Sequence, residues 1–418
     1  MTDEYRIAHL PVECWQDILS YAIGVPLFFD TDPFDNHSFV DVHRYSDEGP
    51  YWESERVRNR LRRVCMSWNV FLSQFHYRYI CTGHVRGGHI PSVALRLAWR
   101  MRLAPCDCSR CIESPKIRRD SEKHAWSSII ETDPLQAEWN LQILDMGGTS
   151  SLELLFDSPS RLANLRVVIE SSEKVVDLVA KANIPLTILD GYSRLTTKLL
   201  PSIPLENVTT LKIFAQLQAG YTIPRIPNLR HLSMHTIATS DSRKYLFDFL
   251  DINGSELITF FWRGTMGVRT QNSIWEKCPN AKSFQLPWDF QWIQPPSGHP
   301  IQHIRLDTER PTGVRPFCSM CGPAHSNVQY VDHLPNLVKA GVQTIAMGCW
   351  YTALFAAPYR SADSGPLSRF MCTRHRASLH GVHLIDTRGL TFEDVVVASL
   401  ERRRQGKPPS KPSISFEF

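Results

Sequence analysis

The stretches Val208-Thr209-Thr210-Leu211-Lys212-Ile213 and Leu229-Arg230-His231-Leu232-Ser233-Met234 share one pattern, in which the first, fourth and sixth residues are apolar. Such a unit is a short strand whose apolar side chains point inward, followed by a segment that returns the chain. One unit cannot bury its own apolar face, so neighbouring units have to stack. The pattern therefore predicts an α/β solenoid, with return helices such as the one expected over residues 242–252.

Copies of this pattern recur through residues 156–396, and those that start at 208, 229, 257, 281 and 301 follow at steps of 21, 28, 24 and 20 residues. The other members are Leu162/Leu165/Val167, Leu186/Ile188 (a weaker copy), Leu257/Phe260/Trp262, Ala281/Phe284/Leu286, Ile301/Ile304/Leu306, Val342/Ile345/Met347 and Leu379/Val382/Leu384. The period resembles that of leucine-rich repeats, which is about 20–29 residues. The Asn or Cys that usually closes each repeat is missing from most copies, and Gln216 and Ile237 stand in two of these places. We therefore expect an irregular array, and an ordinary α/β domain with alternating strands is the alternative.

Two segments near the N-terminus have the apolar spacing of helices. In the first, residues 10–19 (LPVECWQDIL), Pro11 suits the first turn of a helix and Glu13 lies where the helix dipole favours a negative charge. Its apolar face is expected to consist of Trp15, Ile18, Leu19 and Ala22. The second segment, from residue 59 to 75, repeats the spacing for four turns, which predicts one continuous helix. Neither helix has enough apolar surface to be stable alone, so we expect them to pack on each other.

In the order Leu-Pro-x-Glu…Ile-Leu, a gap, and Leu-x-x-Val-Cys-x-x-Trp, residues 5–80 resemble an F-box. This helical module docks a protein onto the Skp adaptor of a cullin ubiquitin ligase. An insertion at about residues 24–50 interrupts the motif, as in fungal F-box families. The resemblance implies that the residues of the module's core and of the adaptor contact are Leu10, Pro11, Glu13, Ile18, Leu19, Leu61, Val64, Cys65 and Trp68. We expect Leu10 and Pro11, at the entry to the first helix, to be the anchors of that contact.

The insertion combines acidic residues with five aromatic ones, which are Phe28, Phe29, Phe34, Phe39 and Tyr45. Disordered segments rarely contain so many aromatic residues, so we expect a partly ordered surface loop that packs on the neighbouring domain. A run of arginines follows, made of Arg56, Arg58, Arg60, Arg62 and Arg63. A solvated helix face is the favoured interpretation of this run, and pairing with an acidic adaptor or with the insertion is the alternative.

Residues 81–155 are expected to form a helical connector that contains the cysteine cluster Cys106, Cys108 and Cys111. A second cluster comprises Cys318, Cys321 and His325, with a possible fourth ligand from the segment of Cys372 and His375. Zinc requires four tetrahedral thiolate or imidazole ligands, so the second cluster is the better candidate. Free thiols in loops are nevertheless the favoured interpretation of both clusters. We therefore predict neither a metal nor another cofactor.

The composition is that of an ordinary globular protein. The chain has 418 residues, of which 43% are hydrophobic and 21% charged, and its net charge of +4 is too small to indicate nucleic-acid or membrane binding. No apolar run approaches the ~18–20 residues of a membrane span, and no signal peptide is expected. The 11 cysteines, an odd number, indicate thiols in the reducing cytoplasm or nucleus.

Residues 397–418 are basic and rich in proline, which predicts a disordered solubilising tail. Nuclear import or contact with an anionic partner is the alternative.

The sequence contains no phosphate-binding Gly-rich loop, no Gly-x-Ser-x-Gly elbow and no His-Glu-x-x-His motif. We therefore expect a non-catalytic subunit. The two resemblances together imply the substrate receptor of a Skp–cullin–F-box ubiquitin ligase, which binds the Skp adaptor, and through it the cullin and RING subunits, with its N-terminal helices. The repeat domain would hold an unknown protein substrate near the conjugating enzyme. The alternatives are a repeat-domain scaffold outside any ligase and a metal-stapled hydrolase-like domain.

Overall fold

The computed structural model describes residues 10–42, 44–86, 89–103, 139–146, 159–169, 173–191, 200, 203–215, 222–236, 240–263, 272–286, 295–306, 334–347, 374–375, 377–386 and 389–405. The chain forms two compact units. The first unit consists of Met1–Asn36 and Arg44–Val167, and the second of His37–His43 and Val168–Phe418.

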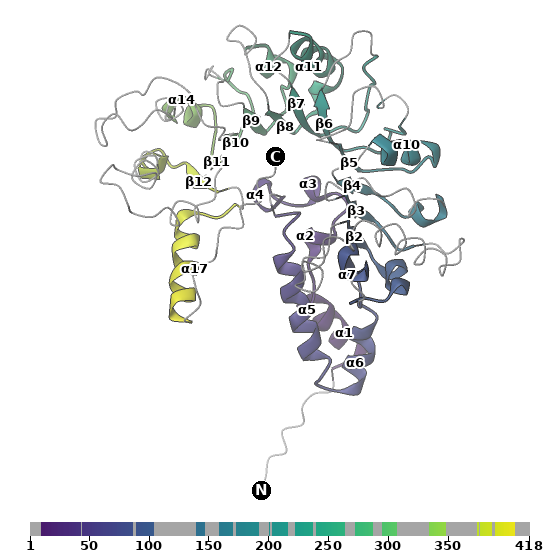
Figure 1. The fold of residues 1–418 in the computed structure, drawn as a ribbon. Coiled ribbons are helices and arrows are strands. Elements are labelled where there is room, and N and C mark those ends of the chain that lie inside the picture. Colours follow the sequence, from purple (N-terminus) through teal and green to yellow (C-terminus); the bar gives the residue numbers. More distant parts are fainter. Residues whose placement is uncertain are drawn as a thin grey trace, which may run out of the picture. The chain divides into compact units, whose positions relative to one another are not determined.

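Parallel strands are the main element of the fold, and twelve of them occur in the described residues. They follow one another in chain order in an open sheet, from β1 to β12 (Figure 1). The strands are β1 Tyr79–Cys81, β2 Arg100–Arg102, β3 Ile143–Asp145, β4 Val167–Ile169, β5 Ile188–Asp190, β6 Thr210–Ala215, β7 His231–Thr236, β8 Thr259–Arg263, β9 Ser283–Leu286, β10 His303–Leu306, β11 Thr344–Met347 and β12 His383–Ile385. The predicted α/β class is therefore confirmed, and β4 to β12 coincide with the predicted copies of the repeat.

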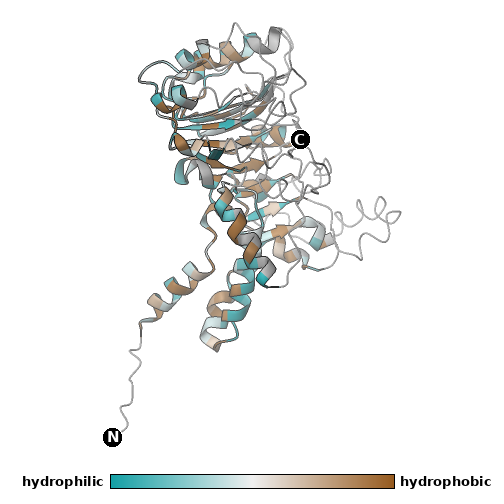
Figure 2. Ribbon diagram, turned by 90° about the vertical axis from the view of Figure 1, so that its left-hand side faces the viewer, coloured by the Kyte–Doolittle hydropathy of each residue, from teal (hydrophilic) through white to brown (hydrophobic). Residues whose placement is uncertain are grey.

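In the second unit, the predicted apolar positions align across the strands. Leu211, Leu232 and Phe260 are register partners in β6, β7 and β8. The same row continues through Phe284, Ile304, Ile345 and Leu384. Every member is buried, and the hydrophobic residues recur from strand to strand (Figure 2). Burying one such side chain contributes about 1.5–3 kcal/mol, so this row is a main source of stability.

The return segments of the second unit are helices α10 Glu173–Lys181, α11 Ser240–Asn253, α12 Asn272–Lys277, α14 Leu334–Lys339 and α17 Phe392–Arg404, with a 3-10 turn at Gly254–Glu256. Helix α11 covers the predicted return segment at 242–252. The structure differs from expectation at two places in this unit. Leu379, predicted to point inward, is 69% exposed. Residues 397–404, expected in a disordered tail, belong to α17, and residues 406–418 lie outside the described part of the chain.

The first unit contains the N-terminal helices and the beginning of the sheet. Its helices are α1 Val12–Ala22, α2 Pro26–Phe29, α3 Pro33–Asn36, α5 Gly49–Leu61, α6 Met66–Ser73 and α7 Thr82–Arg86, with 3-10 turns at Ser92–Leu97 and Pro159–Leu162. Helix α4, Phe39–Val42, belongs to the second unit. The segment expected as a helical connector also contains β2, β3 and the end of β1, which begin the sheet before the first predicted repeat.

The second predicted helix is not continuous. Helix α5 begins at Gly49, inside the expected insertion, and ends at Leu61. Cys65 then has an extended backbone, with φ −157° and ψ 168°, and α6 starts at Met66. The apolar spacing persists across this break, because a short turn brings α6 back onto the same hydrophobic cluster as α5.

The insertion is more ordered than a surface loop. It forms the short helices α2 to α4, and it contributes the buried side chains of Phe28 (in α2) and Tyr45 to the first unit. Phe28 stacks on Tyr51 of α5, with ring centroids 5.6 Å apart, and meets Tyr79 of β1 edge-on at 5.1 Å. Aromatic side chains bury large apolar areas, so this cluster joins the insertion to α5 and to the first strand. Among the described helices, none has the length and apolarity to cross a membrane.

Candidate functional site

Helices α1, α5 and α6 form a bundle that we call the helical module. Its centre consists of Leu19, Ile23 and Leu72, which are 2%, 0% and 0% exposed. Partly buried side chains surround this centre, and they are Val57, Leu61, Trp68, Phe71 and Phe75. The rings of Trp15 and Trp68 pack at 5.5 Å between centroids, which holds the first turn of α1 against the first turn of α6.

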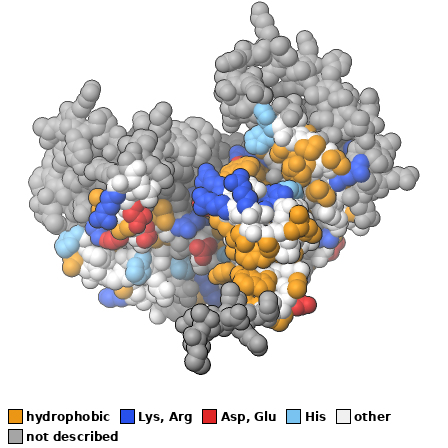
Figure 3. Space-filling model, turned by 90° about the horizontal axis from the view of Figure 1, so that it is seen from below, with side chains coloured by type: hydrophobic (Ala, Val, Ile, Leu, Met, Phe, Trp, Pro, Cys, Tyr) orange, Lys and Arg blue, Asp and Glu red, His pale blue; other side chains and the backbone are white. Residues whose placement is uncertain are grey.

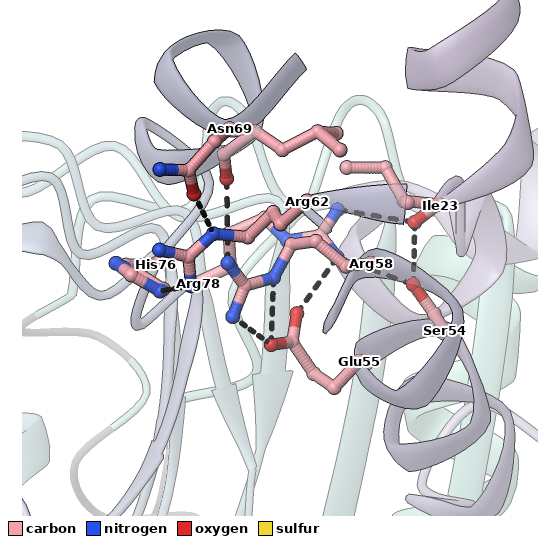
Figure 4. Close-up of polar contacts among 9 residues, drawn as sticks. Ile23, Ser54, Glu55, Arg58, Arg62, Asn69, His76 and Arg78 are labelled. Carbon is pink, nitrogen blue, oxygen red and sulfur yellow. Dashed lines mark hydrogen bonds and ion pairs between the residues drawn. The ribbon is translucent and has the colours of Figure 1, made fainter. Parts of the chain in front are cut away.

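A buried polar network links the three helices to the segment before β1 (Figure 4). Arg58 of α5 donates to the Glu55 carboxylate through Nε (2.9 Å) and Nη2 (2.6 Å), and to the Leu72 carbonyl of α6 (3.3 Å). Arg78 donates to the Ile23 carbonyl at the end of α1 and to Glu55, each at 3.2 Å. Buried charges are tolerated only when paired and hydrogen-bonded, so this network holds the helices in one arrangement.

Ser54 of α5 completes the network. Its hydroxyl donates to the Ile23 carbonyl at 2.6 Å and accepts a hydrogen bond from Arg78 at 3.2 Å. The backbone carbonyl that ends α1 is therefore satisfied by two side chains. A helix end without such partners would leave a buried carbonyl unpaired.

The arginine run is not a uniform solvated face. Arg58 is only 4% exposed, contrary to expectation. Arg62 donates to Asn69 Oδ1 at 2.8 Å and lies 2.7 Å from Nε2 of His76. Arg56 pairs with Glu53 on the surface, and Arg60 and Arg63 are exposed. The sequence could not separate these roles, because they depend on where α6 packs.

Besides its core, the module presents large apolar side chains to solvent. The exposed fractions are 66% for Val12, 48% for Ile18, 62% for Val64, 76% for Met66 and 67% for Val70. With Leu10 (44%), Trp15 (36%) and Tyr21 (91%), these residues make up what we call the exposed apolar surface. Figure 3 shows hydrophobic side chains gathered at the end of the first unit that holds α1 and α6. Large exposed apolar patches of this kind mark interaction sites.

The residues that the sequence predicts for the module core and the adaptor contact divide between surface and core. Leu10, Pro11, Glu13, Ile18, Val64 and Cys65 are exposed. Leu19 is buried in the core, and Leu61 and Trp68 pack against it. The predicted apolar face of α1 is likewise divided, since Leu19 points inward and Ile18 and Ala22 are exposed.

Sequence reasoning missed four members of the exposed apolar surface, which are Val12, Tyr21, Met66 and Val70. The sequence of α6 could have indicated two of them, because Met66 and Val70 are four residues apart and therefore lie on one side of the helix, opposite Leu72. A short helix that is apolar on both sides indicates either complete burial or a partner.

Cys65 lies between α5 and α6, with its Sγ 3.2 Å from the Ser67 hydroxyl. Hydrogen bonds from Ser67 and from the Trp68 backbone lower the pKa of this exposed thiol. A lowered pKa raises the thiolate fraction, and thiolates are the reactive form of cysteine.

The described residues contain no group of three or more His, Cys, Asp or Glu side chains that could hold a metal ion. The predicted clusters, Cys106, Cys108 and Cys111, and Cys318, Cys321, His325 and Cys372, lie outside the described residues. What the described residues provide is an exposed apolar surface on a packed and hydrogen-bonded set of helices. No protein-family model, curated protein or solved structure matches this chain.

Proposed function

We propose that this protein is the substrate-recognition subunit of a Skp–cullin–F-box ubiquitin ligase. In this proposal the helical module is an interrupted F-box that binds the Skp adaptor through the exposed apolar surface. The strands of the second unit are the irregular leucine-rich-type repeats that hold a protein substrate.

The observation that carries the proposal is the exposure of the apolar side chains. Val64, Met66 and Val70 are each more than 60% exposed, although apolar side chains of this size are usually buried. Removing such side chains from water contributes about 25 cal/mol of free energy per Å² of apolar area, which favours the binding of a partner that covers them.

The rigid base of the surface also supports a docking role. Arg58 joins α5 to the Leu72 carbonyl of α6, and Arg78 joins the Ile23 carbonyl of α1 to Glu55 of α5, so the three helices are fixed before any partner binds. Less conformational freedom is then lost on association, so more of the interaction energy appears as affinity.

The mechanism in this proposal is proximity. The repeat domain holds the substrate so that its lysines lie near a ubiquitin-loaded conjugating enzyme, which raises the effective concentration of the reacting groups. The chain then needs to supply binding and orientation, and the conjugating enzyme supplies the chemistry.

Co-purification with a Skp adaptor tests this proposal. We expect the wild-type chain to form a 1:1 complex and the double variant Ile18→Asp/Val64→Asp to lose it. Both positions are exposed, so the fold should be retained, as circular dichroism would show. The matched control is Val397→Asp/Leu400→Asp in α17, where both side chains are also about half exposed.

Two outcomes would contradict the proposal. A folded wild-type chain that forms no complex would favour the scaffold that joins no ligase. Equal loss in the α17 control would show that a new charge disrupts association wherever it is placed, so that the helical module is not the contact.

A further inference from the structure

Two exposed arginines border the exposed apolar surface. Arg60 lies in the last turn of α5, and Arg63 lies in the turn before α6, next to Val64. Neither has an ion-pair partner among the described residues, whereas Arg56 pairs with Glu53 and Arg58 with Glu55. Figure 3 shows Lys and Arg side chains beside the hydrophobic ones on this face.

Local structure accounts for only part of this arrangement. A cation in the last turn of a helix interacts favourably with the helix dipole, which explains a basic residue at Arg60. The dipole does not require a second unpaired cation at Arg63, beyond the end of α5 and next to the exposed Val64.

The exposed negative charges of α1 lie away from these arginines. Glu13 and Asp17 are exposed on α1, and Trp15, which lies midway between them in the sequence, packs on Trp68 of α6. Residues two apart in a helix lie about 200° apart around its axis, so Glu13 and Asp17 lie on the side of α1 opposite Trp15. Arg60 and Arg63 therefore give the apolar surface a basic border, and such a border steers a partner of opposite charge.

We propose that the partner of the exposed apolar surface is an acidic protein whose carboxylates pair with Arg60 and Arg63. This inference rests on the proposed function, in which the partner is the Skp adaptor. Nucleic acid also offers negative charge to arginine. The adjacent Val64, Met66 and Val70 favour a protein, because they would gain nothing from contact with phosphates.

The test compares the adaptor affinity of the wild-type chain, Arg60→Gln/Arg63→Gln and Arg56→Gln over a range of salt concentrations. Arg56→Gln is the control, because it removes one exposed arginine charge from α5 one turn before Arg60. Two surface ion pairs predict roughly 2- to 30-fold weaker binding of the double variant at low salt. The difference should shrink as salt screens the charges, and the control should bind as wild type does.

The outcomes separate this inference from the proposed function. If the wild-type chain binds no adaptor, both fall. If it binds, but the double variant matches Arg56→Gln at every salt concentration, the acidic-partner inference is overturned and the proposed function stands. Binding of a single-stranded oligonucleotide that the double variant loses, without any change in adaptor affinity, would also overturn the inference.

Discussion

The guanidinium of Arg100 lies 4.1 Å from the centroid of the Phe28 ring, and its Nη1 donates to the Phe28 carbonyl at 2.7 Å. The same side chain lies 4.7 Å from the Tyr45 ring and donates to the Tyr45 carbonyl at 3.0 Å. Arg100 belongs to β2, and the two aromatic residues belong to the insertion. One buried cation therefore holds two points of the insertion on the beginning of the sheet.

We expect Arg100→Met to lower the free energy of unfolding by about 2–4 kcal/mol, since two buried carbonyls lose a charged donor. Chemical denaturation would measure this loss. The exposed Arg56→Met is the control, with an expected change within about 0.5 kcal/mol. Equal stability of the two variants would show that Arg100 does not hold the insertion.

The charge of Glu48 should make the free energy of unfolding depend on pH. Burial opposes its charged form, but hydrogen bonds from Tyr79 (2.6 Å), Arg102 (2.6 Å) and Trp52 (3.2 Å) outweigh burial and lower the Glu48 pKa. A carboxylate whose pKa is lowered by folding stabilises the protein above the pKa of the unfolded state, about 4.3 for glutamate. That stability is lost as the pH falls through the folded pKa.

Accordingly, Glu48→Gln should be less stable than wild type at pH 7, and the difference should shrink below about pH 4.3. Urea denaturation of both proteins at a series of pH values measures this difference in stability. A difference that stays constant down to pH 3 would mean that the Glu48 charge plays no part.

His76 should make the free energy of unfolding depend on pH as well, in a higher pH range than Glu48 does. Burial, together with the nearby charges of Arg58 and Arg62, lowers the pKa of His76. Its Nε2 lies 2.7 Å from Nη1 of Arg62, so the neutral ring accepts a hydrogen bond there and a protonated ring could not. Stability from this histidine is complete above the unfolded pKa of about 6.5 and decreases as the pH falls through the lower folded value.

His76→Gln should therefore weaken the dependence of unfolding free energy on pH below about 6.5. Titration of the His76 ring by NMR gives the direct measurement. A folded pKa above that of an unfolded histidine would contradict the assignment.

Truncating a side chain on one side of α6 should lower stability, and truncating one on the other side should weaken binding. Leu72→Ala should cost about 2–5 kcal/mol of unfolding free energy, because Leu72 is fully buried in the module core. Val70→Ala, two residues away and 67% exposed, should leave stability within about 0.5 kcal/mol and weaken adaptor binding instead. Thermal unfolding and co-purification measure the two effects. Similar stability losses in both variants would place Val70 in the core.

In the second unit, Gly254 follows α11 where the backbone of α12 comes close. A Cβ at this position would overlap the carbonyl oxygen of Lys277. We expect Gly254→Ala to cost about 1–3 kcal/mol, because neither backbone can yield without shifting its helix. The neighbouring Ser255→Ala, at an exposed position, is the control in thermal unfolding. An unchanged melting temperature of Gly254→Ala would show that the two helices can separate at little cost.

The sequence determined the elements whose signal is local and periodic. Leu211, Leu232 and Phe260 were predictable as strand residues because the six-residue pattern repeats, and stacking follows from the need to bury them. Helix α1 was predictable from Pro11, Glu13 and the apolar spacing that follows. In contrast, β1, β2 and β3 precede the recognised copies, and Arg78, Arg100 and Arg102 around them hide the apolar alternation.

Only the tertiary structure decided which side of each helix is covered. Ile18 and Leu19 are adjacent and similar in hydrophobicity, yet one is 48% exposed and the other 2%. That difference depends on where α5 and α6 lie, which no local pattern specifies. The same holds for Arg58 and Arg60, of which one is buried beside Glu55 and the other faces solvent. Burial is a property of packing between distant segments, so the candidate surface emerged only once the helices were assembled.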